Sequence, residues 1–197
     1  MLHVRLIHAE QFRRWMVFVM GALCLLLSAC GGTQSPAQPT TGAIAAAWVG
    51  TVEGTDVFVG MASNGKEVMA YVCDGKTISQ WFHGQVGVDR LDLVAGTVDL
   101  SVNNAKLQSQ LTKDTASGNV TLADGKSFKF QAAKASGDSC LYRLEQTINN
   151  EKWVAGWVVL NNGQLRGVNV NLNTNAIQPQ TTLNNLAKII GPTIPQY

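Results

Sequence analysis

Short apolar runs alternate with turn residues along the chain from Trp48 onward. Within many runs the apolar residues take every second position, as Val98, Leu100 and Val102 do. A period of two is typical of strands in a sheet that buries one face. The pattern predicts strands at residues 48–53, 56–62, 66–73, 76–83, 90–94, 97–102, 105–111, 118–123, 126–132, 139–147, 153–160 and 164–172.

The segments between these runs are short and rich in residues that tolerate a positive φ. Asn64-Gly65, Asp74-Gly75, Asp124-Gly125 and Asn162-Gly163 each join two predicted strands. Such dipeptides are strong signals for tight hairpins. We therefore expect a mainly β fold, an antiparallel meander of about ten short strands that forms a barrel or a sandwich.

The C-terminal part of the chain has a different period. Leu183, Leu186 and Ile190 recur at helical spacing, a threonine at 181 or 182 can cap a helix start, and Gly191-Pro192 can end it. These features predict one short C-terminal helix, packed on the sheet or closing one end of a barrel.

Residues 1–29 have the layout of a signal peptide. Arg5, Arg13 and Arg14 supply positive charge, and an uncharged apolar run follows at residues 15–27. As a helix this run would reach only ~20 Å, whereas the hydrocarbon core of a bilayer is about 30 Å thick. A signal peptide therefore fits better than the alternative, a short transmembrane anchor.

The run ends in Leu27-Ser28-Ala29-Cys30, which resembles the lipobox of bacterial lipoproteins. The resemblance implies that the leader is cut before Cys30, that its thiol is joined to diacylglycerol, and that the new amino group is also acylated. Several acyl chains on one residue meet the physical requirement for stable anchoring. Gly31 stands where an Asp would favour the inner membrane, so the resemblance implies a cell-envelope location, in the outer membrane where two membranes exist.

The segment after Cys30 contains Gly, Ser, Thr, Gln and Pro but no charge and no large apolar residue. Such a segment cannot bury enough surface to offset its ordering entropy. We expect a signal peptide at 1–29, the lipidated Cys30 and a flexible linker at 30–43, and one β-rich globular domain at 44–197.

Charge excludes one class of partner. The leader holds three Arg and one Glu, so the chain that begins at Cys30 has equal numbers of basic and acidic residues. It contains no block of Lys or Arg, which argues against nucleic acid as a partner.

Two cysteines remain for the domain, because Cys24 leaves with the leader and Cys30 carries lipid. A leftover pair in an exported protein predicts a disulfide between Cys73 and Cys140. The alternative is a pair of buried, reduced thiols, since geometry decides whether two cysteines can bond.

No combination of residues points to catalysis. His83 is the one histidine after Cys30, and the sequence offers no zinc ligand set, nucleophile elbow or phosphate-binding loop. We therefore expect no metal, no cofactor and no enzymatic activity. Asp74 and Asp124 could form a paired-carboxylate site, but their Asp-Gly setting favours a role in turns.

The remaining candidates are aromatic. Tyr71, Trp81 and His83 share one pleat face of two adjacent predicted strands, opposite Ile78 and Phe82. An exposed face of this kind would contact a ligand or partner. The alternative is that both faces are covered by other elements, since Trp is mostly a packing residue.

These observations predict a lipid-anchored envelope protein with a non-catalytic β domain that binds a partner or supports an assembly. The expected partners are the membrane, through the anchor, and an envelope protein or a glycan. Two alternatives stay open: a small carboxylate-dependent hydrolase, and a carrier that holds an apolar ligand in a barrel cavity.

Overall fold

The computed structural model describes residues 45–88 and 96–190, which belong to one compact unit, residues 41–197. The predicted signal peptide, Cys30, the linker and the predicted strand at 90–94 lie outside the described residues. Over the described ranges the chain forms strands and no helix, and therefore no helix long and apolar enough to cross a membrane.

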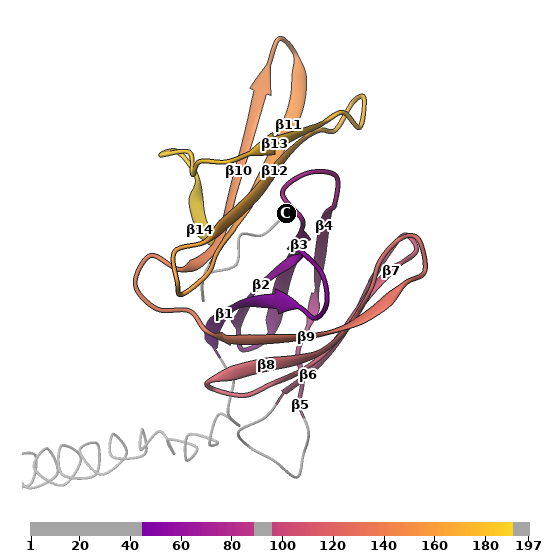
Figure 1. Ribbon diagram of the computed structural model, residues 1–197, viewed down its shortest axis with the longest axis vertical. Helices are drawn as coiled ribbons and strands as arrows, with labels where there is room; N and C mark the ends of the chain where they lie inside the picture. The colour runs from indigo at the N-terminus through magenta and orange to yellow at the C-terminus, as the bar shows by residue number, and fades with distance from the viewer. Residues whose placement is uncertain (1–44, 89–95, 191–197) are drawn as a thin grey trace, which may run out of the picture. The chain divides into compact units, whose positions relative to one another are not determined.

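The described residues form fourteen strands, and every pairing between them is antiparallel, which confirms the predicted fold class (Figure 1). The strands are β1 (Ala45–Val52), β2 (Phe58–Asn64), β3 (Glu67–Cys73), β4 (Ser79–Gln85), β5 (Gly87–Val88), β6 (Gly96–Val102), β7 (Ala105–Leu111), β8 (Thr115–Thr121), β9 (Ser127–Lys134), β10 (Cys140–Ile148), β11 (Glu151–Val159), β12 (Leu165–Asn171), β13 (Ile177–Gln180) and β14 (Lys188–Ile190).

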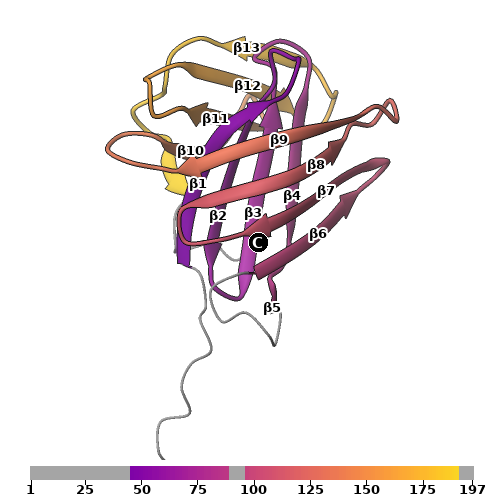
Figure 2. The ribbon, with the colours of Figure 1, turned by 60° about the horizontal axis from the view of Figure 1, so that its bottom comes forward.

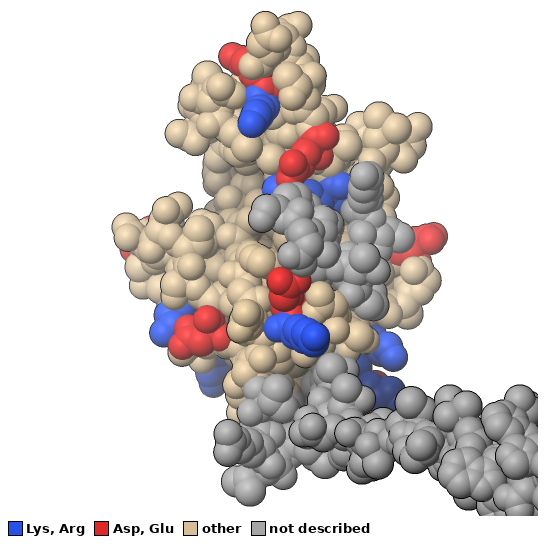
Figure 3. All heavy atoms as spheres, turned by 180° about the vertical axis from the view of Figure 1, so that it is seen from behind, with Lys and Arg blue, Asp and Glu red and all other residues tan. Residues whose placement is uncertain are grey.

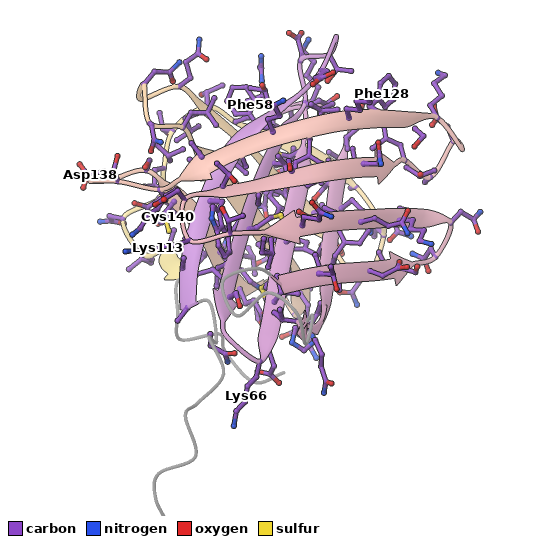
Figure 4. All side chains as sticks on the ribbon, turned by 90° about the horizontal axis from the view of Figure 1, so that it is seen from below. Phe58, Lys66, Lys113, Phe128, Asp138 and Cys140 are labelled. Carbon is purple, nitrogen blue, oxygen red and sulfur yellow. The ribbon has the colours of Figure 1, made fainter. Side chains whose placement is uncertain are left out.

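The first nine strands form one sheet in the order β4-β3-β2-β1-β9-β8-β7-β6-β5. Figures 2 and 4 show β6 to β9 crossing β1 to β4 at a steep angle, so the sheet folds back over itself. Strands that cross in this way enclose a core between their facing sides. The first sheet is a nearly closed barrel.

One strand that changes partner closes most of this barrel. Only Val86 separates β4, which pairs with β3, from β5, which pairs with β6. Two glycines allow the close approach at this seam: a Cβ on Gly84 would lie 2.5 Å from Leu100 Cδ2, and a Cβ on Gly96 would lie 2.7 Å from Val86 Cγ1. A larger residue at either glycine would push the seam apart.

Alternating side chains fill the barrel interior. In β6 the odd and even positions divide cleanly: Val98 and Leu100 are buried, whereas Thr97 and Asp99 are exposed. The largest side chains in the interior come from strands on both sides of the crossing, and they are Trp48, Met61, Phe82, Leu107, Leu111 and Phe130. The barrel interior is therefore a packed core, and it does not favour the alternative of an apolar ligand carrier.

The last five strands form a second sheet in the order β13-β12-β11-β10-β14. It packs on the outer side of β1 to β3, where Leu141, Val158 and Val168 meet Phe58 and Met69. The strand β3 therefore has two buried faces. Its even-numbered residues 68, 70 and 72 point into the barrel, and its odd-numbered residues 69, 71 and 73 point toward the second sheet.

The predicted C-terminal helix is wrong. Residues 188–190 form β14, and Ile190 pairs with Leu141 of β10. Leu186 is 67% exposed, so the helical spacing of Leu183, Leu186 and Ile190 does not mark one buried face. Asn184 instead caps a turn, accepting a hydrogen bond from the Leu186 N–H at 2.8 Å.

The side-chain amide of Asn161 links the second sheet to the segment between β9 and β10 through hydrogen bonds. Asn161, in the turn between β11 and β12, donates to the Lys134 carbonyl at 3.0 Å and accepts from the Ser136 N–H at 3.2 Å. Its Oδ1 also accepts from the Ser139 hydroxyl. These bonds fix the path from β9 to β10 and so help to set how the two sheets meet.

Candidate functional site

Tyr71 and Trp81 lie between the two sheets. They are cross-strand partners in β3 and β4, their ring centroids are 4.2 Å apart, and their planes differ by 28°. Tyr71 is fully buried, and its hydroxyl lies 3.0 Å from the Ser79 hydroxyl. Burial raises the pKa of the Tyr71 phenol well above its ordinary value.

The second sheet covers this pair directly. A Cβ on Gly156 of β11 would lie 2.6 Å from Trp81 Cζ2 and 2.7 Å from Tyr71 Cε1, so the rings rest against bare backbone. The guanidinium of Arg143, in β10, lies 4.5 Å from the centroid of a Trp81 ring. Such a contact adds a cation–π attraction to the packing.

The expectation of an exposed face made by Tyr71, Trp81 and His83 therefore needs correction. His83 is at the surface, one pleat further along β4, but Tyr71 is inside and Trp81 is half-buried. The structure brings Tyr71 and Trp81 together as packing residues between the sheets and leaves His83 outside their stack. For Tyr71 and Trp81 the alternative holds, in which other elements cover both faces of the strands.

The predicted disulfide is absent: Cys73 and Cys140 are both free and buried. The Cys73 Sγ lies 3.6 Å from the Arg166 carbonyl oxygen, and the Cys140 Sγ lies 3.4 Å from the Ile190 carbonyl oxygen. Three interstrand steps, about 14 Å, separate those two carbonyl groups, because they end one cross-strand row made of Arg166, Val158, Leu141 and Ile190. A bridge needs Cα atoms within about 7 Å, so this fold keeps the two thiols apart.

The two candidate carboxylates serve their own turns. The Asp74 carboxylate accepts 2.8 Å hydrogen bonds from the N–H groups of Lys76, Thr77 and Ile78. Partial burial acts to raise the pKa of Asp74, but these donors outweigh it and hold the pKa below its ordinary value. Asp124 accepts from the Lys126 N–H, which lowers the pKa of that carboxyl too. This arrangement does not favour a paired-carboxylate hydrolase.

The described residues contain no group of three His, Cys, Asp or Glu side chains that could hold a metal ion. They do contain a large open hollow, a trough of about 610 Å³ on the outer face of β6 to β9. Its floor is the backbone of one cross-strand row whose side chains lie on the barrel side of the sheet: Val98, Ser109, Gly118 and Phe130.

Two parallel rows of outward side chains form the walls of this trough. One row is wholly polar and uncharged: Thr97, Gln110, Ser117 and Gln131. The other adds one acid and one base: Asp99, Gln108, Asn119 and Lys129. All of these side chains are exposed, so the trough offers amide and hydroxyl groups to a ligand.

Part of the charge in the trough is neutralised locally. The Asp99 carboxylate accepts a hydrogen bond from Gln108 Nε2 at 3.2 Å and forms an ion pair with Lys106 at 3.4 Å. The amide groups of Gln110, Asn119 and Gln131 form no hydrogen bond with another described residue. On the face drawn in Figure 3, acidic and basic side chains are likewise scattered in small groups.

A second hollow, of about 600 Å³, lies next to the junction of the sheets. Its wall includes Leu160 and Asn161 from the second sheet and Gly50 and Ala132 from the barrel. The Asn161 amide at its rim already bonds its own chain. Its other polar residues are Thr51, Thr115 and Asn162, together with Ser117 and Gln131, which it shares with the trough. The trough on β6 to β9 carries two complete polar rows and is the better candidate for a binding site.

Comparisons with models of protein families, with curated proteins and with solved structures find no match to this chain. Its function therefore has to be argued from its own residues and geometry.

Sequence reasoning missed the trough. The signal was present as alternation in residues 97–99, 117–119 and 129–131, where polar residues flank Val98, Gly118 and Phe130, whereas residues 108–110 are all polar. Alternation predicts that these side chains face outward, but it does not give the register that aligns them in rows across four strands.

We predict that Trp81→Ala lowers the free energy of unfolding by about 3 kcal/mol, because it leaves a cavity between Tyr71 and Gly156. Gly156→Ala should cost about 1–3 kcal/mol by overpacking the same contact. The matched control, His83→Ala on the exposed part of the same strand, should change stability by less than ~0.5 kcal/mol. Urea unfolding measures all three, and an unchanged midpoint for Trp81→Ala would contradict the packing role.

We also predict that the protein, isolated without reductant, contains Cys73 and Cys140 as thiols. Burial raises the pKa of Cys73 to about 12 and also raises the pKa of Cys140. Because the thiolate is the reactive form, neither should react with iodoacetamide at about pH 8 until the chain unfolds. Mass spectrometry after labelling with and without denaturant measures this, and a mass that shows one bridged pair would contradict it.

Proposed function

We propose that this chain is a lipid-anchored protein of the cell envelope whose β domain is a non-catalytic binding module. The anchor is Cys30, on the strength of the leader and of the lipobox-like residues before it. In a cell with two membranes, Gly31 favours the outer one. The linker at 30–43 would then hold the domain away from the lipid surface.

The single observation that supports a binding module is the trough on β6 to β9. It is concave, it spans four strands, and the amide groups of Gln110, Asn119 and Gln131 form no hydrogen bond within the described part of the fold. The outward side chains of any antiparallel sheet line up in cross-strand rows, and here two neighbouring rows are polar across all four strands. Ordered donors and acceptors of this kind suit recognition of a polar ligand.

The rest of the chemistry is in keeping with a non-catalytic role. Within the described residues both thiols are buried, Asp74 and Asp124 are occupied by turns, and His83 has no acid or nucleophile bonded to it. General acid–base or nucleophilic catalysis needs such groups within hydrogen-bond reach of each other.

The anchor can be tested by substituting, one at a time, the two cysteines near the predicted cut site. Cys30→Ser should abolish incorporation of a fatty-acid analogue and release the protein from the membrane fraction, because the acceptor thiol is lost. Cys24→Ser is the matched control, since that residue should leave with the leader, and it should label and fractionate like the wild type. Retention of both label and membrane association by Cys30→Ser would refute the proposed anchor.

A further inference from the structure

We infer that the trough binds a neutral oligosaccharide, lying across β6 to β9 with its hydroxyl groups bonded to the two wall rows. This inference rests on the proposed function, because it names the ligand class of the same site. Three features of the trough carry it: the kind of polar group on its walls, its charge and its floor.

The walls match hydroxyl groups in chemistry and in spacing. Side-chain amides offer donors and acceptors together, as sugar hydroxyls do. Gln110 and Gln131 stand in one row and Asn119 in the other, and each amide is free of bonds to other described residues. Neighbours in a row lie ~4.8 Å apart, and the rows are separated by two residues of strand, ~6.7 Å. A short sugar chain can therefore meet several amides at once.

The charge of the trough argues against an anionic ligand. Lys129 is the one base among the wall side chains, and Asp99 and Glu53 supply acids at the same site. Asp99 is already paired with Lys106. An anionic polymer or a phosphate would need clustered bases, such as arginines that bond it bidentately, and the trough has no such cluster. A neutral ligand would not have to displace any strong ion pair.

The floor indicates how the ligand is held. No Trp or Tyr lines the trough, and its floor is the backbone of the inward-facing row that contains Val98, Ser109, Gly118 and Phe130. Binding must then come from hydrogen bonds without aromatic stacking, so each site is weak. A protein anchored in a membrane beside a polymeric glycan gains from many weak sites, because anchoring raises the effective concentration of each.

The test uses the whole mature protein, which begins at the lipidated Cys30, in a detergent that has no sugar head group. Chitohexaose and maltohexaose are titrated into it by calorimetry, and the two sugars separate N-acetyl chemistry from plain hydroxyl chemistry. We expect at least one to bind, with an affinity that changes little between about 0.05 and 0.5 M salt, since no charge is neutralised.

The variant Gln110→Ala/Gln131→Ala should weaken this binding about tenfold, the loss expected for two hydrogen-bonding groups. Gln178→Ala, an exposed amide in β13 on the other sheet, is the matched control and should bind like the wild type. Thermal unfolding shows whether each variant keeps its fold, and Asn119→Ala provides a second test from the opposite wall if the double variant is unstable.

Three results would overturn the inference: binding of neither sugar, wild-type affinity in folded trough variants, or steep loss of affinity with salt. These failures are separate from failure of the proposed function. If the protein binds no sugar but needs Cys30 for its lipid label, the proposed function as an anchored envelope protein stands, and the ligand is of another class.

Discussion

The burial of β3 on both of its faces is the contact on which the rest of the structure depends. Val68, Ala70 and Val72 close the barrel core, while Met69, Tyr71 and Cys73 form the base on which the second sheet rests. Apolar burial stabilises at roughly 25 cal/mol per Å², and one strand supplies both layers with such surface. The two sheets are therefore coupled through the same backbone.

This coupling determines where a ligand can reach the barrel. The second sheet occupies the outer side of β1 to β3, so the aromatic side chains there become packing residues. The opposite wall, β6 to β9, keeps its outer face free and can carry a polar surface without loss of core. In our proposal, recognition belongs to the outer face of β6 to β9, while their inner face builds the barrel core. The polar rows can therefore change with little effect on folding.

Much of the fold could be predicted from local chemistry, and little of the site could. Asp-Gly and Asn-Gly turns and period-two runs determine single hairpins, because neighbouring residues decide them. The prediction that Tyr71 and Trp81 are exposed was wrong, because a period of two assigns residues to one face of a strand but does not say what covers that face. The prediction of a C-terminal helix was wrong, because the strand pairing of Ile190 with Leu141 outweighs the helical spacing of the apolar residues. The disulfide and the trough both depend on long-range register, which a single sequence does not contain.

Native-state hydrogen exchange tests the coupling of the two sheets most directly. If β3 joins them, amides of β3 and of the central strand β11 should exchange through one global unfolding event with the same free energy. Gly156→Ala should then lower both values equally. Exchange of β11 at a clearly lower free energy, with β3 unchanged by that substitution, would show that the second sheet opens independently and would contradict the account.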